Sequence, residues 1–157
     1  MTTRTLSAML TTRRAVSADL TELARLFDAY RQFYEQPSDA PGALAYLQAR
    51  MAADESVICV AQAEGRGPLL GFVQLYPTWC SVEMARTAML YDLFVSTEAR
   101  RGGVGRVLMQ AAHVAAAQMG AVRVDLSTAH TNTRAQALYE SLGWQLDTTF
   151  RYYTLRV

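Results

Sequence analysis

Residues 100–106 combine positive charge with bare main chain, and both properties suit the binding of an anion. The segment reads Arg-Arg-Gly-Gly-Val-Gly-Arg. Each glycine costs about 1 kcal/mol relative to alanine if it lies inside a helix. Where a turn opens a helix, however, glycine lets a phosphate approach the free N–H groups and the positive end of the helix dipole. The segment therefore predicts a phosphate cradle; a glycine-rich turn that binds nothing is the alternative.

Two common nucleotide-binding motifs do not fit this segment. All 15 basic residues of the chain are arginine, so the lysine of a GxxxxGK[ST] loop is missing. A GxGxxG fingerprint starting at Gly103 fails because Leu108 stands where the last small residue belongs. Any mechanism that needs a lysine is excluded for the same reason.

The elements that must position this segment alternate between strands and helices. We expect a first strand over residues 10–16, followed by an amphipathic helix in which Leu23, Phe27 and Tyr30 recur at helical spacing. A shorter helix around residues 44–51 and strands over residues 56–64, 69–77 and 87–95 come next, with residues 78–86 as a connection. The glycine segment then opens a helix that ends at Gly120. A strand (121–128), a helix (131–143) and two final strands or one bent hairpin (144–157) follow. The sum is one α/β domain over residues 1–157, with a mostly antiparallel sheet and one parallel strand–helix–strand unit.

Composition limits the classes of partner. The net charge of +1 provides no overall field for nucleic acid or an anionic membrane. The hydropathy pattern leads us to expect neither a spanning segment nor a leader sequence. Cys59 and Cys80 form no CxxC pair, which predicts small core residues in a reducing compartment. With His113 and His130 they have no metal-ligand spacing. We therefore expect a cytoplasmic protein without a nucleic-acid, membrane or metal partner.

Two motifs resemble those of one enzyme family. Arg100-x-x-Gly103-x-Gly105 resembles the acetyl-CoA motif Q/R-x-x-G-x-G/A of the GNAT N-acetyltransferase superfamily. Residues 132–144, NTRAQALYESLGW, resemble its second block, N-x-x-A-x-x-L-Y-x-x-x-G-F/W, at the usual downstream distance. The order of the expected elements is also similar. The stretches YDLFV and FRYYTLRV further resemble the subgroup that acetylates histones, polyamines and small amines.

The resemblance implies a fold and a cofactor. The fold would be a mixed, mostly antiparallel sheet of six to seven strands with about four helices, and a cleft where the fourth and fifth strands splay apart. The fourth strand would carry a bulge, and its end would bind the pantetheine arm of acetyl-CoA as an added strand. An N–H near Leu93 or Phe94 would stabilise the oxyanion, and Asn132 would bond the pantetheine or cap its helix. The cofactor-binding residues implied are Leu93, Phe94, Val95, Arg100, Arg101, Gly102, Gly103, Val104, Gly105, Arg106, Asn132, Ala135 and Tyr139.

The resemblance also implies how protons move. Tyr139 would protonate the leaving thiolate, since a thiol has a pKa of about 8.5 and tyrosine of about 10; filling the apolar stripe of its helix is the alternative. Related enzymes often place a glutamate base on the fourth strand, but Met89 and Tyr91 stand at the positions to inspect. Asp92 is adjacent, although strand alternation turns it to the face opposite Tyr91 unless a bulge intervenes. Tyr139 and Asp92 are the catalytic candidates, although strand alternation favours a structural hydrogen bond for Asp92 over the role of base. Glu83, in the loop before this strand, is another candidate base. Tyr91 or a water chain is the remaining alternative.

Aromatic residues with a few acids suit an amine acceptor, because ring faces attract cations. By resemblance, the substrate-binding candidates are Tyr30, Tyr34, Trp79, Glu83 and Tyr91, with Phe33 and Tyr76 nearby; the same residues could pack a core or a dimer. The implied activity is transfer of acetyl from acetyl-CoA to a primary amine of a small molecule, polyamine or protein, by direct attack in a ternary complex. The alternative is a non-catalytic module that binds acyl-CoA. A homodimer is suggested only by analogy, with Tyr152 and Tyr153 as candidate contacts.

Overall fold

The computed structural model describes residues 9–64 and 67–157. The contacts among them form two compact units, one ending at Leu126 and one running Ser127–Val157. Each unit is described by itself.

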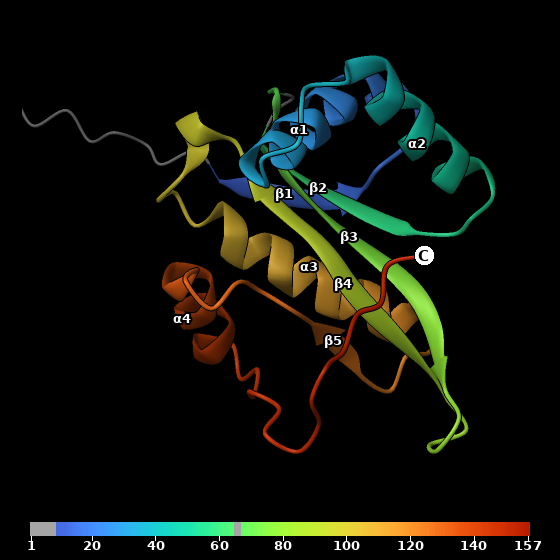
Figure 1. The fold of residues 1–157 in the computed structure, drawn as a ribbon. Coiled ribbons are helices and arrows are strands. Elements are labelled where there is room, and N and C mark those ends of the chain that lie inside the picture. Colours follow the sequence, from blue (N-terminus) through green and yellow to red (C-terminus); the bar gives the residue numbers. More distant parts are fainter. Residues whose placement is uncertain (1–8, 65–66) are drawn as a thin grey trace, which may run out of the picture. The chain divides into compact units, whose positions relative to one another are not determined.

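The first unit is built on a mixed sheet whose strands follow one another in chain order (Figure 1). Its strands are β1 (Leu10–Arg14), β2 (Val57–Ala63), β3 (Leu69–Cys80), β4 (Ala85–Val95) and β5 (Val124–Leu126). Neighbours from β1 to β4 are antiparallel, whereas β4 and β5 are parallel. Parallel pairing needs a crossover, which the helix between these two strands provides. The predicted fold class is confirmed.

Helices cover both faces of this sheet (Figure 1). α1 (Leu20–Phe33) and α2 (Ala40–Ala52) lie on one face, and α3 (Val104–Gln118) lies on the other. The core under α1 and α2 is apolar and includes Leu23, Phe27, Leu47, Ile58, Val60, Phe72 and Phe94. α2 begins after Asp39, whose carboxylate accepts the Gly42 N–H at 2.9 Å. This cap fixes the end of α2 that will border the site described below.

β4 contains a bulge at Tyr91. Gln74 of β3 pairs with Asp92, but the next residue, Leu75, pairs with Leu90. Tyr91 is therefore an extra residue in β4, which shifts the side-chain alternation by one position. The parallel ladder with β5 covers Ala88–Leu90 and stops directly before the bulge. From Tyr91 onward, β4 has no strand partner on its β5 side among the described residues, which is the open edge that the resemblance implies.

The strand number differs from the prediction. The described residues form five strands rather than six or seven, because residues 144–157 contain no strand. These residues favour the β conformation locally, but they pair with no neighbouring strand among the described residues. Instead, the Asp147 carboxylate accepts the N–H groups of Thr149 and Phe150 in a turn. The β3–β4 hairpin is longer than expected, since Thr78–Cys80 pairs with residues 85–87. The predicted connection of residues 78–86 thereby shrinks to four residues, 81–84.

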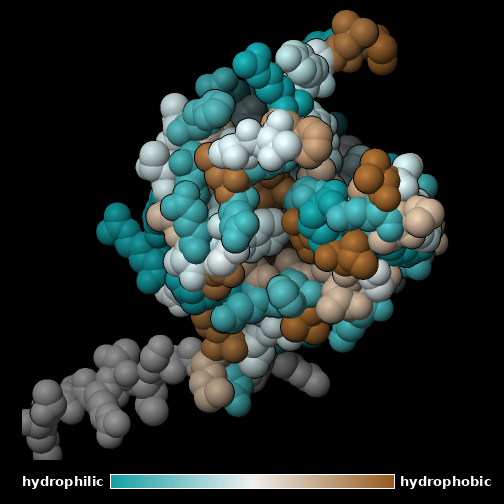
Figure 2. Space-filling view, turned by 90° about the horizontal axis from the view of Figure 1, so that it is seen from below, coloured by the Kyte–Doolittle hydropathy of each residue, from teal (hydrophilic) through white to brown (hydrophobic). Residues whose placement is uncertain are grey.

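The second unit contains one helix, α4 (Thr133–Ser141), within the range described. In the described part of the chain, no helix has the length and apolar character needed to cross a membrane. The surface in Figure 2 shows hydrophobic residues in small groups among hydrophilic ones. Exposed apolar residues scattered in this way are normal on protein surfaces.

Candidate active site

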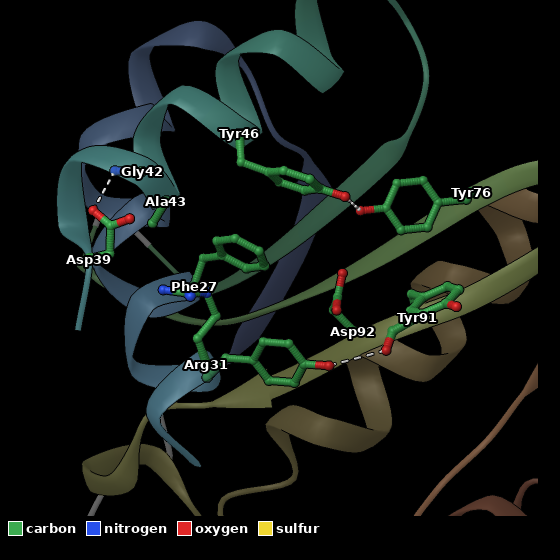
Figure 3. A pocket seen from close by; sticks show the side chains of 10 residues that line it. Phe27, Arg31, Asp39, Gly42, Ala43, Tyr46, Tyr76, Tyr91 and Asp92 are labelled. Atoms are coloured by element: carbon green, nitrogen blue, oxygen red, sulfur yellow. Dashed lines mark hydrogen bonds between the residues drawn. The ribbon is translucent and has the colours of Figure 1, made fainter. Parts of the chain in front are cut away.

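A pocket of about 590 Å³ lies where α1 and α2 face β3 and β4 (Figure 3). Its lining residues are Phe27, Tyr30, Arg31, Asp39, Gly42, Ala43, Tyr46, Tyr76, Tyr91 and Asp92. Two hydrogen bonds hold its tyrosines. The hydroxyls of Tyr46 and Tyr76 lie 2.6 Å apart, and the Tyr30 hydroxyl donates to the Tyr91 carbonyl at 3.2 Å. The result is an aromatic wall with oriented hydroxyl groups.

Asp92 is the buried acid of this pocket. It is 6% exposed, and in Figure 3 its carboxylate points toward the hydroxyl groups of the Tyr46–Tyr76 pair. The bulge explains its direction, because the extra residue brings both Tyr91 and Asp92 to the pocket. The condition set by strand alternation, that a bulge must intervene, is therefore met.

Burial raises the pKa of the Asp92 carboxyl above its usual value, because the charged form loses contact with water. Hydrogen bonds from Gln74 and Tyr30 partly oppose this rise in pKa; Gln74 Nε2 donates to Asp92 Oδ2 at 2.6 Å. Within the described residues, no arginine or histidine forms an ion pair with Asp92. The pocket thus contains a desolvated carboxyl group without a protein counter-charge, and a bound cation would complement it.

Tyr76 is not a candidate base. Burial raises the pKa of its phenol, and the hydrogen bond with Tyr46 and the nearby Asp92 raise it further. All three effects oppose ionisation, so Tyr76 stays neutral at physiological pH. Its hydroxyl is a hydrogen-bonding group of the pocket wall.

The structure brings together only some of the predicted acceptor residues. Tyr30, Tyr76 and Tyr91 line the pocket together with the catalytic candidate Asp92. The other acceptor candidates do not line it: Phe33, Tyr34, Trp79 and Glu83. Trp79 lies three residues beyond Tyr76 along β3, about 10 Å at the usual rise of a strand. It is 68% exposed beneath the Arg86 guanidinium. Glu83, on the same hairpin, pairs with Arg123 at 2.6 Å, and Tyr34 packs its ring edge-on against Tyr30 outside the pocket.

Six lining residues were not identified as acceptor residues from the sequence: Phe27, Arg31, Asp39, Gly42, Ala43 and Tyr46. Phe27 and Arg31 are four residues apart on α1, so they share the helix face that carries the predicted apolar stripe. Tyr46 interrupts the Leu44–Leu47 stripe of α2. An aromatic residue on the flank of such a stripe is the signal that could have indicated it.

We expect replacement of Tyr76 with leucine to raise the KM for the acceptor by about tenfold, since one wall of the pocket loses its hydroxyl and ring. Trp79→Leu is the matched control on the same strand, and its KM should stay within about twofold of the wild type. Steady-state kinetics with a saturating acyl donor measure both. A larger effect from Trp79→Leu would place the acceptor at the hairpin instead.

The glycine segment forms the turn between a short 3-10 helix (Thr97–Ala99) and α3. Gly103 precedes α3 with φ +82°, and Arg101 has φ +66°. The main-chain N–H groups of residues 101–105 have no hydrogen-bond partner among the described residues, and no side chain caps α3. A Cβ placed on Gly103 would meet nothing within 4 Å, so open space lies beside these donors. Free N–H groups at a helix N-terminus suit the diphosphate of coenzyme A.

Gly103→Leu is expected to weaken coenzyme A binding by about tenfold or more, because φ +82° is strained for leucine and the turn must move. Gly120→Leu is the matched control: Gly120 has φ +78° with the same open space, at the other end of α3. Both variants should lose similar thermal stability, but only Gly103→Leu should lose binding in calorimetric titration. Unchanged affinity in Gly103→Leu would argue against the cradle.

The open edge of β4 presents particular main-chain groups. Ser96 N–H donates to the Leu70 carbonyl of β3 at 2.8 Å. Since main-chain groups alternate along an antiparallel strand, those of Phe94 also face β3, whereas those of Leu93 and Val95 face the open edge. The Val95 carbonyl accepts from Arg100 Nε at 3.3 Å. Of the two expected oxyanion donors, Leu93 therefore has the suitable direction.

The remaining predicted residues belong to the second unit. Asn132 caps α4 by accepting the Ala135 N–H at 3.4 Å, which is the capping role that the sequence left open. Tyr139 lies on α4 with its ring centroid 6.2 Å from that of Trp144. Among the described residues, no group of three or more His, Cys, Asp or Glu side chains could hold a metal ion.

The chain is similar to known acetyltransferases in sequence and in fold. The model of the "Acetyltransferase (GNAT) family" matches residues 23–144. The "Uncharacterized N-acetyltransferase YhfO" of Bacillus subtilis (strain 168) is 47% identical over 145 residues, covering 92% of this chain and 96% of that protein. A "Probable acetyltransferase" of Haemophilus influenzae is 36% identical over 90 residues, covering 57% and 61%. The crystal structure of a "probable acetyltransferase" superposes with a TM-score of 0.88 at 39% identity, covering 94% and 97%. The chain belongs to the acetyltransferase (GNAT) family and is an acyltransferase.

Proposed function

We propose that this enzyme transfers an acetyl group from acetyl-CoA to a primary amine whose ammonium group binds beside Asp92. One observation carries the acceptor class: the Asp92 carboxyl is buried in a tyrosine-lined pocket without a cationic protein partner. An ammonium supplies the missing charge, and the surrounding ring faces attract the same cation. A neutral or anionic acceptor would leave this carboxyl group uncompensated.

The donor side uses main-chain groups of this chain. The free N–H groups of residues 101–105 would hold the diphosphate, and the open edge of β4 would hold the pantetheine arm. Bound acetyl-CoA supplies an activated acetyl thioester. The Leu93 N–H is our candidate for the hydrogen bond that polarises the reacting carbonyl.

Proton transfer is assigned to two side chains. The amine must lose a proton before it attacks, because an alkyl ammonium has a pKa of about 10. Asp92 accepts that proton, and burial improves the match by raising the pKa of its carboxyl toward neutral pH. Tyr139 Oη is the proposed proton donor. The family match spans residues from both compact units, which supports the proposal that the whole chain is one acetyltransferase domain.

The test is the release of free thiol from acetyl-CoA across a panel of primary amines that includes monoamines, polyamines and lysine peptides. We expect release that saturates with both substrates and intersecting lines in initial-velocity plots, as a ternary complex requires. Parallel lines or a trapped acetyl-cysteine would instead indicate a covalent intermediate. Coenzyme A binding without thiol release from any amine would support the non-catalytic module.

A further inference from the structure

Gln74 occupies an unusual position for an amide. It lies in the middle of the central strand β3 with 0% of its surface exposed. Its Nε2 donates to Asp92 Oδ2 at 2.6 Å, but its Oε1 is buried without a hydrogen-bond partner in the part of the chain that the structure describes. A buried acceptor without a donor is unfavourable, so a leucine or methionine would suit a purely structural role better.

We propose that Gln74 is the positioning residue that holds the Asp92 carboxyl in both of its protonation states. This proposal rests on the proposed function in one respect, namely that Asp92 accepts the proton of the bound ammonium. Before transfer, Gln74 Nε2–H donates to the carboxylate. The ammonium N–H bond then breaks while an O–H bond forms on Asp92, and the positive charge of the amine and the negative charge of the carboxylate disappear together.

The unpaired Oε1 of Gln74 can form a hydrogen bond once Asp92 is protonated. A protonated carboxyl group has become a donor, and rotation of the Gln74 amide by about 180° about its terminal bond exchanges Nε2 for Oε1. Oε1 then accepts the new O–H of Asp92. A carboxamide offers a donor and an acceptor at equal reach, so the carboxyl group keeps one partner on β3 throughout the reaction.

The surroundings of Asp92 explain why this partner is neutral. The titratable groups that face it are Tyr30 from α1, Tyr46 from α2, Tyr76 from β3 and Tyr91 from β4. Arg31 and Asp39 are the other charged residues of the pocket. Neither Arg31 nor any other described cation forms an ion pair with Asp92. A lysine or arginine at position 74 would lower the pKa of Asp92 and compete with the ammonium. Asparagine is shorter by one methylene group and could not reach from the same strand position.

Carbon-13 NMR titration of the aspartate carboxyl groups tests the proposal without any acceptor. The Asp92 signal is assigned by its absence in Asp92→Asn. In Gln74→Met, the hydrogen bonds to both protonation states of Asp92 are lost. The titration midpoint of Asp92 should move to higher pH, because the lost bond to the charged carboxylate is stronger than the lost bond to the neutral carboxyl group. Gln74→Glu should move it further, because two carboxyl groups then share one proton. Gln62→Met is the matched control on β2, where Gln62 accepts from Arg13 at 3.1 Å, and it should leave the midpoint unchanged.

Kinetics supply the second arm, in a double-mutant cycle. Gln74→Met should lower kcat by about tenfold in the otherwise wild-type chain but by less than about twofold when Asp92→Asn is also present. The acidic limb of the kcat/KM profile should move to higher pH together with the NMR midpoint. If the titration midpoint of Asp92 is the same in both Gln74 variants as in the wild type, the positioning role is overturned, even in an active enzyme. A midpoint that moves in a chain unable to acetylate any amine would instead reject the proposed function and leave the Gln74–Asp92 contact intact.

Discussion

Tyr139→Phe is expected to lower kcat by about 10²-fold or more, with little change in the affinity for acetyl-CoA. The substitution removes only the phenolic O–H, and positioned general acids contribute about 10²–10⁴-fold. The ring remains, so its packing near Trp144 on α4 should persist. Steady-state kinetics measure kcat, and calorimetric titration measures coenzyme A binding.

Tyr152→Phe is the matched control, because Tyr152 is an exposed tyrosine of the same unit. It should retain the kcat of the wild type. If Tyr139→Phe also retains it, the tyrosine only fills its helix stripe and another group supplies the proton. A loss of coenzyme A affinity comparable to the loss of kcat would assign Tyr139 to binding.

Asp92→Asn is expected to lower kcat/KM by about 10²-fold or more, since the amide cannot accept the ammonium proton. In the wild type, activity should rise with pH as Asp92 ionises. Because burial raises the pKa of Asp92, this rise should be centred above the usual range of aspartate, about 3.9. The same limb should be missing from the profile of Asp92→Asn. A wild-type profile that is flat from pH 4 to pH 8 would contradict the assignment of Asp92 as base.

Asp92→Asn should lower activity but raise the free energy of unfolding at neutral pH. A carboxyl group whose folded pKa is raised binds its proton more tightly in the folded state, so its stabilising contribution is complete below the unfolded pKa. That contribution is lost as pH rises through the folded pKa. At neutral pH, Asp92→Asn should therefore have a higher melting temperature than the wild type. Asp19→Asn is the contrast: the Arg13 partner lowers the pKa of Asp19, so this variant should be less stable at neutral pH.

Local signals were enough to predict the main-chain features that we propose for binding the acyl donor. The glycine segment, the start of α3 and the Asn132 cap each depend on a few consecutive residues, and all are present. The strand–helix–strand unit and its parallel pairing follow from the spacing of these elements.

The tyrosine-lined pocket that we propose for the acceptor could not be predicted in the same way, because it depends on contacts between distant segments. The direction of Asp92 is set by a one-residue register shift against β3, which no local pattern in β4 reveals. Tyr46 enters the site from α2, and its hydroxyl forms a hydrogen bond with that of Tyr76, thirty residues away in the chain. The prediction of strands in residues 144–157 was wrong for a related reason. These residues have the composition of strands, but a strand forms only where a neighbouring strand completes its hydrogen bonds.

The extra residue in β4 also constrains how this enzyme can diverge. The bulge ends the ladder with β5 on one edge of the strand, and on one face it turns Asp92 toward the tyrosine-lined pocket. Deleting Tyr91 would lengthen the ladder with β5 along the edge that we propose for the pantetheine arm, and it would turn Asp92 away from the pocket. Acceptor preference is therefore free to drift through point substitutions in α1 and α2, whereas length changes in this strand would be lethal to the chemistry. Variation among descendants of this sequence should accordingly concentrate on the helical wall.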